Sequence, residues 1–164
     1  MKPWLPALIP ACALVLAGCG AVDAGEPVQL PTTQACFVSG ASGFPVSLEV
    51  ASDNAARQKG LMGRKELAEN AGMLFQYQEQ RPASYGFWMF KTLIPLDIAY
   101  LDDQGVIVSM RHMHPCASSR GTDCPSYPAG EPFWNAVEMK AGYFADRGIS
   151  PGDRLAWPAT DCPP

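Results

Sequence analysis

The segment YGFWMFKT, residues 85–92, places an indole and a lysine inside a run of large apolar side chains. Read as a strand, it is apolar at the centre of both faces, whereas a strand with one solvated face alternates apolar and polar residues. One face must therefore meet a core. We expect the segment from Leu61 to Leu67 to cover the other face, and the alternative is that this face lines a pocket. In that case Trp88 would offer a stacking surface with one hydrogen-bond donor.

Six side chains within motifs are candidate contacts for a small polar ligand, such as a glycan or an anionic metabolite. Five of them are charged, and they would surround the aromatic floor that the tryptophan provides. The alternative is structural, because Asp97 with Arg111 and Glu138 with Arg64 would then be ion pairs that fix strand register. The six candidates are Arg64, Trp88, Lys91, Asp97, Arg111 and Glu138.

Catalysis and metal binding are alternatives to ligand binding. Asp97 and Glu138 would be the acids of a carbohydrate-active or other hydrolase, in which two carboxyls flank the scissile bond. Alternation in SMRHMHPC puts Met110, His112 and His114 on one side of a strand, and thioether with imidazole ligands suits copper. Polar residues at a strand end are ordinary, so we expect no metal and no other cofactor. No catalytic residue is assigned, and enzymatic activity stays open.

The first residues are typical of a secretion signal. Lys2 precedes an apolar run, Leu5 to Leu16, that is too short to cross a bilayer. The run ends in Leu16-Ala17-Gly18-Cys19, which resembles the lipobox of bacterial lipoproteins, in which the cysteine is acylated and becomes the first mature residue. Two or three acyl chains at Cys19 would anchor the protein stably. We therefore expect a location in the cell envelope, lipid-anchored and facing the periplasm or the cell exterior.

Four further cysteines remain in the expected mature chain, and an even number indicates disulfides in an oxidising compartment. Three connectivities are possible, and a tetrathiolate zinc site is a competing interpretation. We expect Cys116 to pair with Cys124 because they bracket a short polar loop. Cys36 would then pair with Cys162 and join the two ends of the domain.

Length and charge indicate one domain without affinity for nucleic acid. Residues 1–18 are the expected signal peptide, 19–35 a flexible tether and 36–164 a single β-sandwich domain. The formal net charge is −4, and loss of Lys2 with the signal makes it −5. No basic run is present, so nucleic acid and anionic surfaces are not expected as electrostatic partners. The expected partners are the membrane, through the lipid, and a small polar ligand or an envelope protein.

Short strands dominate the predicted secondary structure. Seven segments rich in β-branched and aromatic residues are separated by turns, and the chain has 16 prolines and 15 glycines. Residues 53–67 are the one predicted helix, capped by Ser52 or Asp53. Gly60 and Gly63 weaken this helix and indicate close packing or a break near Leu61. These elements predict a mainly β fold, an antiparallel jelly-roll-like sandwich or barrel with one or two short helices. The predicted strands lie within residues 44–51, 72–77, 85–92, 96–102, 106–113, 133–140 and 153–157.

The clearest local prediction is a hairpin around DDQG. A three-residue loop with Gly105 in the left-handed conformation would set Asp102 opposite Val106. Continued without interruption, this register puts Asp97 opposite Arg111. It also gives Leu96, Ile98 and Tyr100 a common face with Val106, Val108 and Met110.

Four motifs together resemble the Domain of Unknown Function 192 family, a bacterial and archaeal family of small extracytoplasmic or stand-alone domains. They are ARQKGLMGRKEL, GMLFQY, GFWMFKTLIPLDIAYLDDQGVIV and AVEMKAG, within about Phe44 to Leu155. The resemblance implies a mainly β, jelly-roll-like sandwich and brings no established activity. Lys91 stands where the family usually has an asparagine. If that asparagine positions a ligand, Lys91 puts the same ligand in doubt or adds a positive charge to the site. We therefore expect a membrane-anchored envelope lipoprotein with a binding or accessory module.

Overall fold

The computed structural model describes residue 1, residues 29–159 and residues 162–164. The expected signal peptide and the lipidated Cys19 lie outside the described residues. Within them the chain forms nine strands and two short α-helices, so the mainly β prediction is confirmed. The elements are β1 (Thr32–Ser39), β2 (Ser42–Ala51), α1 (Asn54–Lys59), β3 (Ala71–Arg81), β4 (Gly86–Trp88), β5 (Leu96–Leu101), β6 (Ile107–Met113), the 3-10 turn Gly121–Asp123, β7 (Ser126–Pro128), β8 (Phe133–Lys140), α2 (Tyr143–Asp146) and β9 (Arg154–Ala156).

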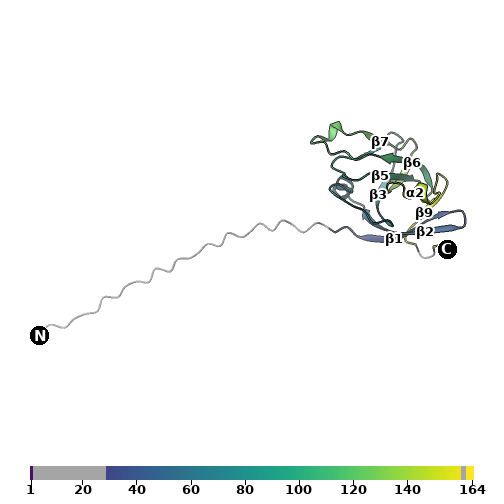
Figure 1. The fold of residues 1–164 in the computed structure, drawn as a ribbon, viewed down its shortest axis with the longest axis horizontal. Coiled ribbons are helices and arrows are strands. Elements are labelled where there is room, and N and C mark those ends of the chain that lie inside the picture. The colour runs from purple at the N-terminus through teal and green to yellow at the C-terminus, as the bar shows by residue number, and fades with distance from the viewer. Residues whose placement is uncertain (2–28, 160–161) are drawn as a thin grey trace.

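Seven strands form one curled sheet in the order β6-β5-β8-β3-β2-β1-β9, and β4 pairs with β7 in a separate ribbon (Figure 1). The expectation of an antiparallel sheet needs one correction, because β2 and β3 run parallel. Residues 52–70 form the crossover that a parallel connection requires, and α1 lies in it. The sequence predicted these elements, but it did not predict which strands lie next to each other in the sheet.

One face of the sheet packs against α2. Leu74, Ala99 and Val137 lie on this α2 face and contact Tyr143 and Phe144 from the helix. These five side chains are at most 3% exposed. Burial of this kind stabilises by roughly 25 cal/mol for each Å² of apolar area removed from water, so the short α2 helix depends on packing.

The opposite face packs against α1 and the chain that follows it. Met73 and Ile98 lie on this α1 face, and Leu61, Phe87 and Met89 cover it. All five side chains are at most 8% exposed. The buried candidate residue Glu138 of β8 lies on this face, beside Met73 and Ile98.

The α1 helix is shorter than predicted. Its first turn is capped as expected, because Asp53 accepts a hydrogen bond from the Ala56 amide at 2.9 Å. The helix ends at Gly60, where φ is 45°, and Gly63 also has a positive φ of 76°. Glycine adopts this conformation at little cost, so the helix ends here, and the predicted break near Leu61 is confirmed.

A β-bulge overturns the predicted hairpin register. The loop itself is correct, since the Asp102 amide donates to the Val106 carbonyl at 3.0 Å. The pairing then shifts between Tyr100 and Leu101, and the extra residue moves every later side chain of β6 to the other face. Ile98 therefore lies opposite Arg111. The prediction of Asp97 opposite Arg111 is wrong, and so is the shared face with Met110, which packs in the other core. Val108 does pack in the same core as Ile98 and Tyr100.

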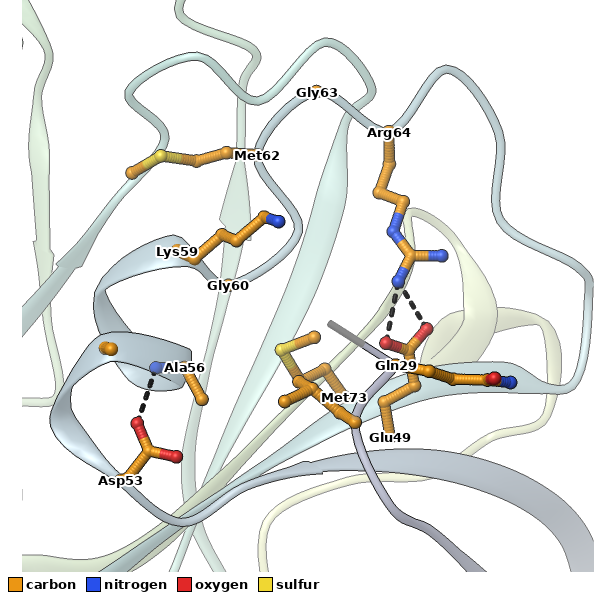
Figure 2. A pocket seen from close by; sticks show the side chains of 12 residues that line it. Gln29, Glu49, Asp53, Ala56, Lys59, Gly60, Met62, Gly63, Arg64 and Met73 are labelled. Carbon is orange, nitrogen blue, oxygen red and sulfur yellow. Dashed lines mark hydrogen bonds and ion pairs between the residues drawn. The ribbon is translucent and has the colours of Figure 1, made fainter. Parts of the chain in front are cut away.

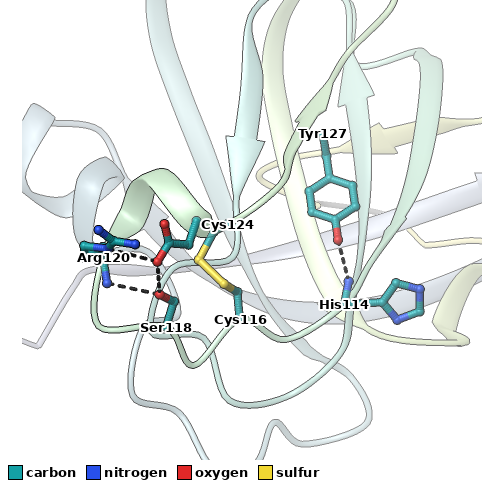
Figure 3. The surroundings of a disulfide bond; sticks show 7 residues. His114, Cys116, Ser118, Arg120, Cys124 and Tyr127 are labelled. Atoms are coloured by element: carbon teal, nitrogen blue, oxygen red, sulfur yellow. Dashed lines mark hydrogen bonds and ion pairs between the residues drawn. A yellow bond between two sulfur atoms is a disulfide. The ribbon is translucent and has the colours of Figure 1, made fainter.

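Both predicted disulfides are present. Cys36 pairs with Cys162 across a Cα separation of 5.7 Å, and Cys116 pairs with Cys124 at 5.8 Å. Figure 1 shows the C-terminus beside β1 and β2, where the first bond fastens it, and Figure 3 shows the loop closed by the second. Disulfides persist in oxidising compartments, so they indicate a domain outside the reducing cytosol.

The N-terminal boundary of the folded domain lies earlier than the expected tether end at residue 35. Strand β1 begins at Thr32 and pairs with β2 and β9. Phe37 of this strand is fully buried. In the described part of the chain, no helix is long and apolar enough to cross a membrane.

Candidate functional site

The segment YGFWMFKT has one buried side and one exposed aromatic side. Phe87 and Met89 pack in the α1 core, whereas Trp88 is 47% exposed. The expectation of full cover by the segment from Leu61 is therefore wrong, because Leu61 packs on the buried side. The indole instead lies 5.4 Å from the Phe90 ring and against Gly121, where any side chain would collide with it.

Lys91 occupies a special backbone position rather than a site wall. Its φ is 56°, and it is the one non-glycine residue with positive φ in the described part of the chain. Its amide donates to the Cys116 carbonyl at 2.9 Å, and its carbonyl accepts from the Gly63 amide at 2.9 Å. Asparagine tolerates the left-handed region better than lysine. The backbone conformation at Lys91 therefore accounts for the asparagine that the family usually has at this position, and no ligand is needed to explain it.

The larger hollow, which we call the Lys59 hollow, has a volume of about 550 Å³ and lies between α1 and the loop that follows it. Figure 2 shows Lys59 on one wall and Arg64 paired with Glu49 on the other, with Met73 between them. Its lining consists of Gln29, Leu30, Glu49, Asp53, Ala55, Ala56, Lys59, Gly60, Met62, Gly63, Arg64 and Met73. The volume falls within the range of about 300–1,000 Å³ that is common for small-molecule pockets.

The charges around the Lys59 hollow are mostly neutralised. Arg64 donates to both carboxylate oxygens of Glu49, at 2.5 and 2.7 Å, so the predicted pairing of Arg64 with Glu138 is wrong. Asp53 is the helix cap. Among the described residues, Lys59 makes no ion pair with any carboxylate, so its ammonium group is the charge that remains available for a ligand.

A second, much smaller hollow of about 20 Å³ lies on the other side of the Lys59–Met62 segment and reaches Glu138. We call it the Glu138 hollow. Its lining also includes Trp88 and Thr92, and it shares Lys59, Gly60 and Met62 with the larger hollow. A space of this size holds one water-sized group.

Glu138 is buried in the middle of the sheet without a partner. It lies between Ile98 of β5 and Met73 of β3, both at most 1% exposed, and is itself 4% exposed. Within the described part of the chain, no hydrogen bond or salt bridge to its carboxyl is formed. Burial raises the pKa of Glu138 to about 8, since water no longer solvates the charged form.

Asp97 lies on the opposite side of the sheet from Glu138, because it pairs with Met139 of β8. One carboxylate oxygen is 2.6 Å from His112 Nδ1, and the other accepts from the Gly142 amide at 2.7 Å. The interaction with His112 replaces the predicted pair with Arg111. Two carboxyls on opposite faces do not flank one substrate, so the geometry gives the hydrolase hypothesis no acid pair.

The remaining predicted residues have structural contacts. Arg111 donates to the carbonyls of Met110 and Ala129, both at 2.7 Å. The rings of His112 and His114 are 4.9 Å apart, and the His114 amide binds the Tyr127 hydroxyl (Figure 3). In the described ranges, no three His, Cys, Asp or Glu side chains gather as metal ligands.

The structure therefore brings together three of the six predicted ligand residues around the two hollows: Arg64 at the larger one, and Trp88 and Glu138 at the smaller. Sequence reasoning missed Lys59 and Glu49. Glu49 stands at an ordinary polar position in the alternation of FPVSLEVA, and Lys59 lies in a short helix, so neither residue has a distinctive signal in the sequence.

The fold and the hollows define the class of protein. It is a mainly β domain with two disulfides and with hollows on the α1 face of its sheet. The chain belongs to the Domain of Unknown Function 192 family, described as an uncharacterised ACR, whose model matches residues 37–157. This match confirms the resemblance that the sequence motifs indicated.

Two solved structures are similar to this chain. One is a provisionally assigned transcription regulator from Sinorhizobium meliloti 1021, with 28% identity and a TM-score of 0.72 over 80% of this chain and 97% of its own. The other is a protein of unknown function from Novosphingobium aromaticivorans DSM 12444, with 30% identity and a TM-score of 0.66 over 84% of this chain and 94% of its own. Among curated proteins, no match was found.

Proposed function

We propose that this chain is a lipoprotein, anchored in the cell envelope by Cys19, whose β domain binds a small ligand with an apolar body and an anionic group. The observation that carries the binding proposal is the Lys59 hollow of about 550 Å³. Its floor is apolar, and it offers one ammonium group without an ion pair among the described residues. These features match the general pattern of an apolar pocket with few polar groups.

The chemistry of the walls suggests the orientation of the ligand. The apolar body would contact Met73, Met62 and Leu30, which line the hollow. The anionic group would face Lys59, because Arg64 is already paired with Glu49. Among the described residues, the two carboxylates that line the hollow, Glu49 and Asp53, already have structural partners, so an anion is favoured.

Binding is tested by titrating hexanoate, with hexanol as the neutral control, into the full chain in a non-ionic detergent, followed by calorimetry. We expect hexanoate to bind more tightly than hexanol and Lys59→Gln to reduce hexanoate affinity about fivefold, which is the effect of a partly exposed ion pair of about 1 kcal/mol. Lys65→Gln is the matched control, because Lys65 is exposed in the same loop and does not line the hollow. Equal affinity for hexanoate and hexanol would contradict an anionic ligand.

Membrane anchoring has its own test. Cells that express the full chain are grown with labelled palmitate, and we expect label in the wild-type protein but not in Cys19→Ser. The wild-type protein should fractionate with membranes. Label retained by the variant would place the lipid elsewhere and refute this part of the proposal.

The regulator assignment of the Sinorhizobium protein is not carried over to this chain. DNA binding rests on positive charge, and the formal net charge here is −4. The two disulfides also favour a compartment separate from the chromosome.

A further inference from the structure

We propose that the Glu138 hollow binds a primary ammonium group, with the Glu138 carboxylate as its counter-ion and the Thr92 hydroxyl as a further acceptor. This site adjoins the Lys59 hollow, with which it shares three lining residues, and does not depend on the function proposed above. The inference begins with two polar side chains that are each 4% exposed and line the same small space.

Neither polar group has a partner that explains its burial. In the described ranges, the Glu138 carboxyl and the Thr92 hydroxyl make no side-chain hydrogen bond, although Thr92 is held through its backbone amide and carbonyl. Buried polar groups almost always have a partner, in the protein or outside it. The hollow of about 20 Å³ gives that partner room for one non-hydrogen atom and its hydrogens.

The charges that face Glu138 favour a cation as that partner. From β3 and β5 it meets apolar Met73 and Ile98, and from β5 also Tyr100, whose pKa burial raises further above its ordinary value and whose hydroxyl donates to the Tyr127 carbonyl at 2.5 Å. Tyr100 therefore stays neutral. A buried carboxylate without a nearby positive charge lacks a counter-ion, and an ammonium ion would supply it.

Arg57 and Lys59 of α1 also line the Glu138 hollow, but their charged groups lie away from the Glu138 carboxyl. Arg57 donates to the carbonyls of Ser52 and Gln76, and its guanidinium lies 5.0 Å from the Tyr77 ring. Figure 2 shows the Lys59 side chain extending toward the larger hollow. Arg111 is two strands away and bonded to carbonyls. The guanidinium of Arg81 lies over the Tyr77 and Tyr85 rings.

Trp88 fixes where the rest of the ligand would lie. The small volume admits only the ammonium head, so an alkyl body must extend past the exposed indole, which also lines the hollow. An indole face attracts both apolar groups and cations. The structure thus suggests a primary amine with an apolar chain.

The test is calorimetric titration of n-butylammonium chloride into the full chain in a non-ionic detergent at constant ionic strength, with n-butanol as the neutral probe. Because ammonium binding requires the ionised carboxyl, we expect affinity to rise about tenfold for each pH unit between pH 6 and pH 8 and then to level off. We expect n-butanol to bind at least tenfold more weakly at pH 8.

Variants complete the test. Glu138→Gln, which keeps size and removes the charge, should lower butylammonium affinity at least tenfold at pH 8, and Thr92→Val should lower it severalfold. Glu131→Gln, which removes an exposed carboxylate in the loop before β8, should leave it unchanged. Wild-type affinity in Glu138→Gln, equal binding of n-butanol, or no binding at pH 8 would each overturn the proposal. Loss of hexanoate binding in Lys59→Gln alone would concern only the larger hollow.

Discussion

Replacing Glu138 with glutamine should remove a large pH dependence from the stability of this protein. The carboxyl is buried between Met73 and Ile98, and burial raises its pKa from 4.5 to about 8. Between these two pH values the folded state holds a proton that the unfolded state has lost. The free energy of unfolding therefore falls as pH rises through this window, because the native state binds more protons.

The magnitude follows from the size of the shift. The difference between about 8 and 4.5 is about 3.5 pH units, and each unit corresponds to about 1.4 kcal/mol, so the contribution of Glu138 changes by about 5 kcal/mol in total. This stability is fully present below pH 4.5 and lost by about pH 8. Glutamine has no proton to lose, so Glu138→Gln lacks this component at every pH.

Urea unfolding of the full chain, followed by circular dichroism from pH 5 to pH 9, measures the effect. The variant should gain stability relative to wild type by about 1.4 kcal/mol for each pH unit up to about pH 8, and the difference should then be constant. Glu131→Gln controls for loss of charge and should stay within about 0.5 kcal/mol of wild type. A difference between Glu138→Gln and wild type that does not change from pH 5 to pH 9 would refute the reasoning, because the carboxyl would then ionise as freely in the native state as in the unfolded chain.

Three further changes test other parts of the structure. Lys91→Asn should stabilise the protein by about 1 kcal/mol in urea unfolding, because asparagine adopts the left-handed conformation of this residue at a lower cost than lysine. Lys91→Ala should give no such gain, and equal effects of the two substitutions would rule out this explanation. Asp97→Ala should cost about 2 to 4 kcal/mol, because two contacts to its carboxylate are lost, and a loss below about 0.5 kcal/mol would show that they do not stabilise. Removing both cysteines of the Cys36 disulfide should cost about 5 kcal/mol, against about 2.5 kcal/mol for the Cys116 disulfide, because the sequence separations are 126 and 8; the reverse order in thermal unfolding would refute the loop-entropy argument.

Local patterns in the sequence were sufficient for much of the fold. Strand β8, from Phe133 to Lys140, has the predicted bounds, and Asp53 caps α1 as expected. The two disulfides followed from spacing, because a short polar loop closes easily and leaves only one pairing for the other two cysteines. Strand alternation, capping and turn chemistry act over a few residues, so they can be read without the rest of the chain.

The ion pairs could not be read in the same way. Asp97 was expected opposite Arg111, and a single extra residue in the β6 hairpin set it opposite His112 instead. The strand period is two, so one bulge exchanges the two faces of everything that follows. Arg64 likewise pairs with Glu49, because the parallel crossover from β2 to β3 brings them together.

The candidate site depends on the tertiary structure in the same sense. The sequence marked Glu138 and Trp88 as unusual, since one is a carboxyl within a strand and the other an aromatic beside a lysine. Only the sheet order placed that carboxyl between two apolar strands, and only the break of α1 at Gly60 opened a hollow on each side of the chain that follows. The burial of Glu138 and its raised pKa depend on neighbours that are distant in the sequence, so only the tertiary structure determines them. The sequence by itself determines only which side chains can respond to that burial.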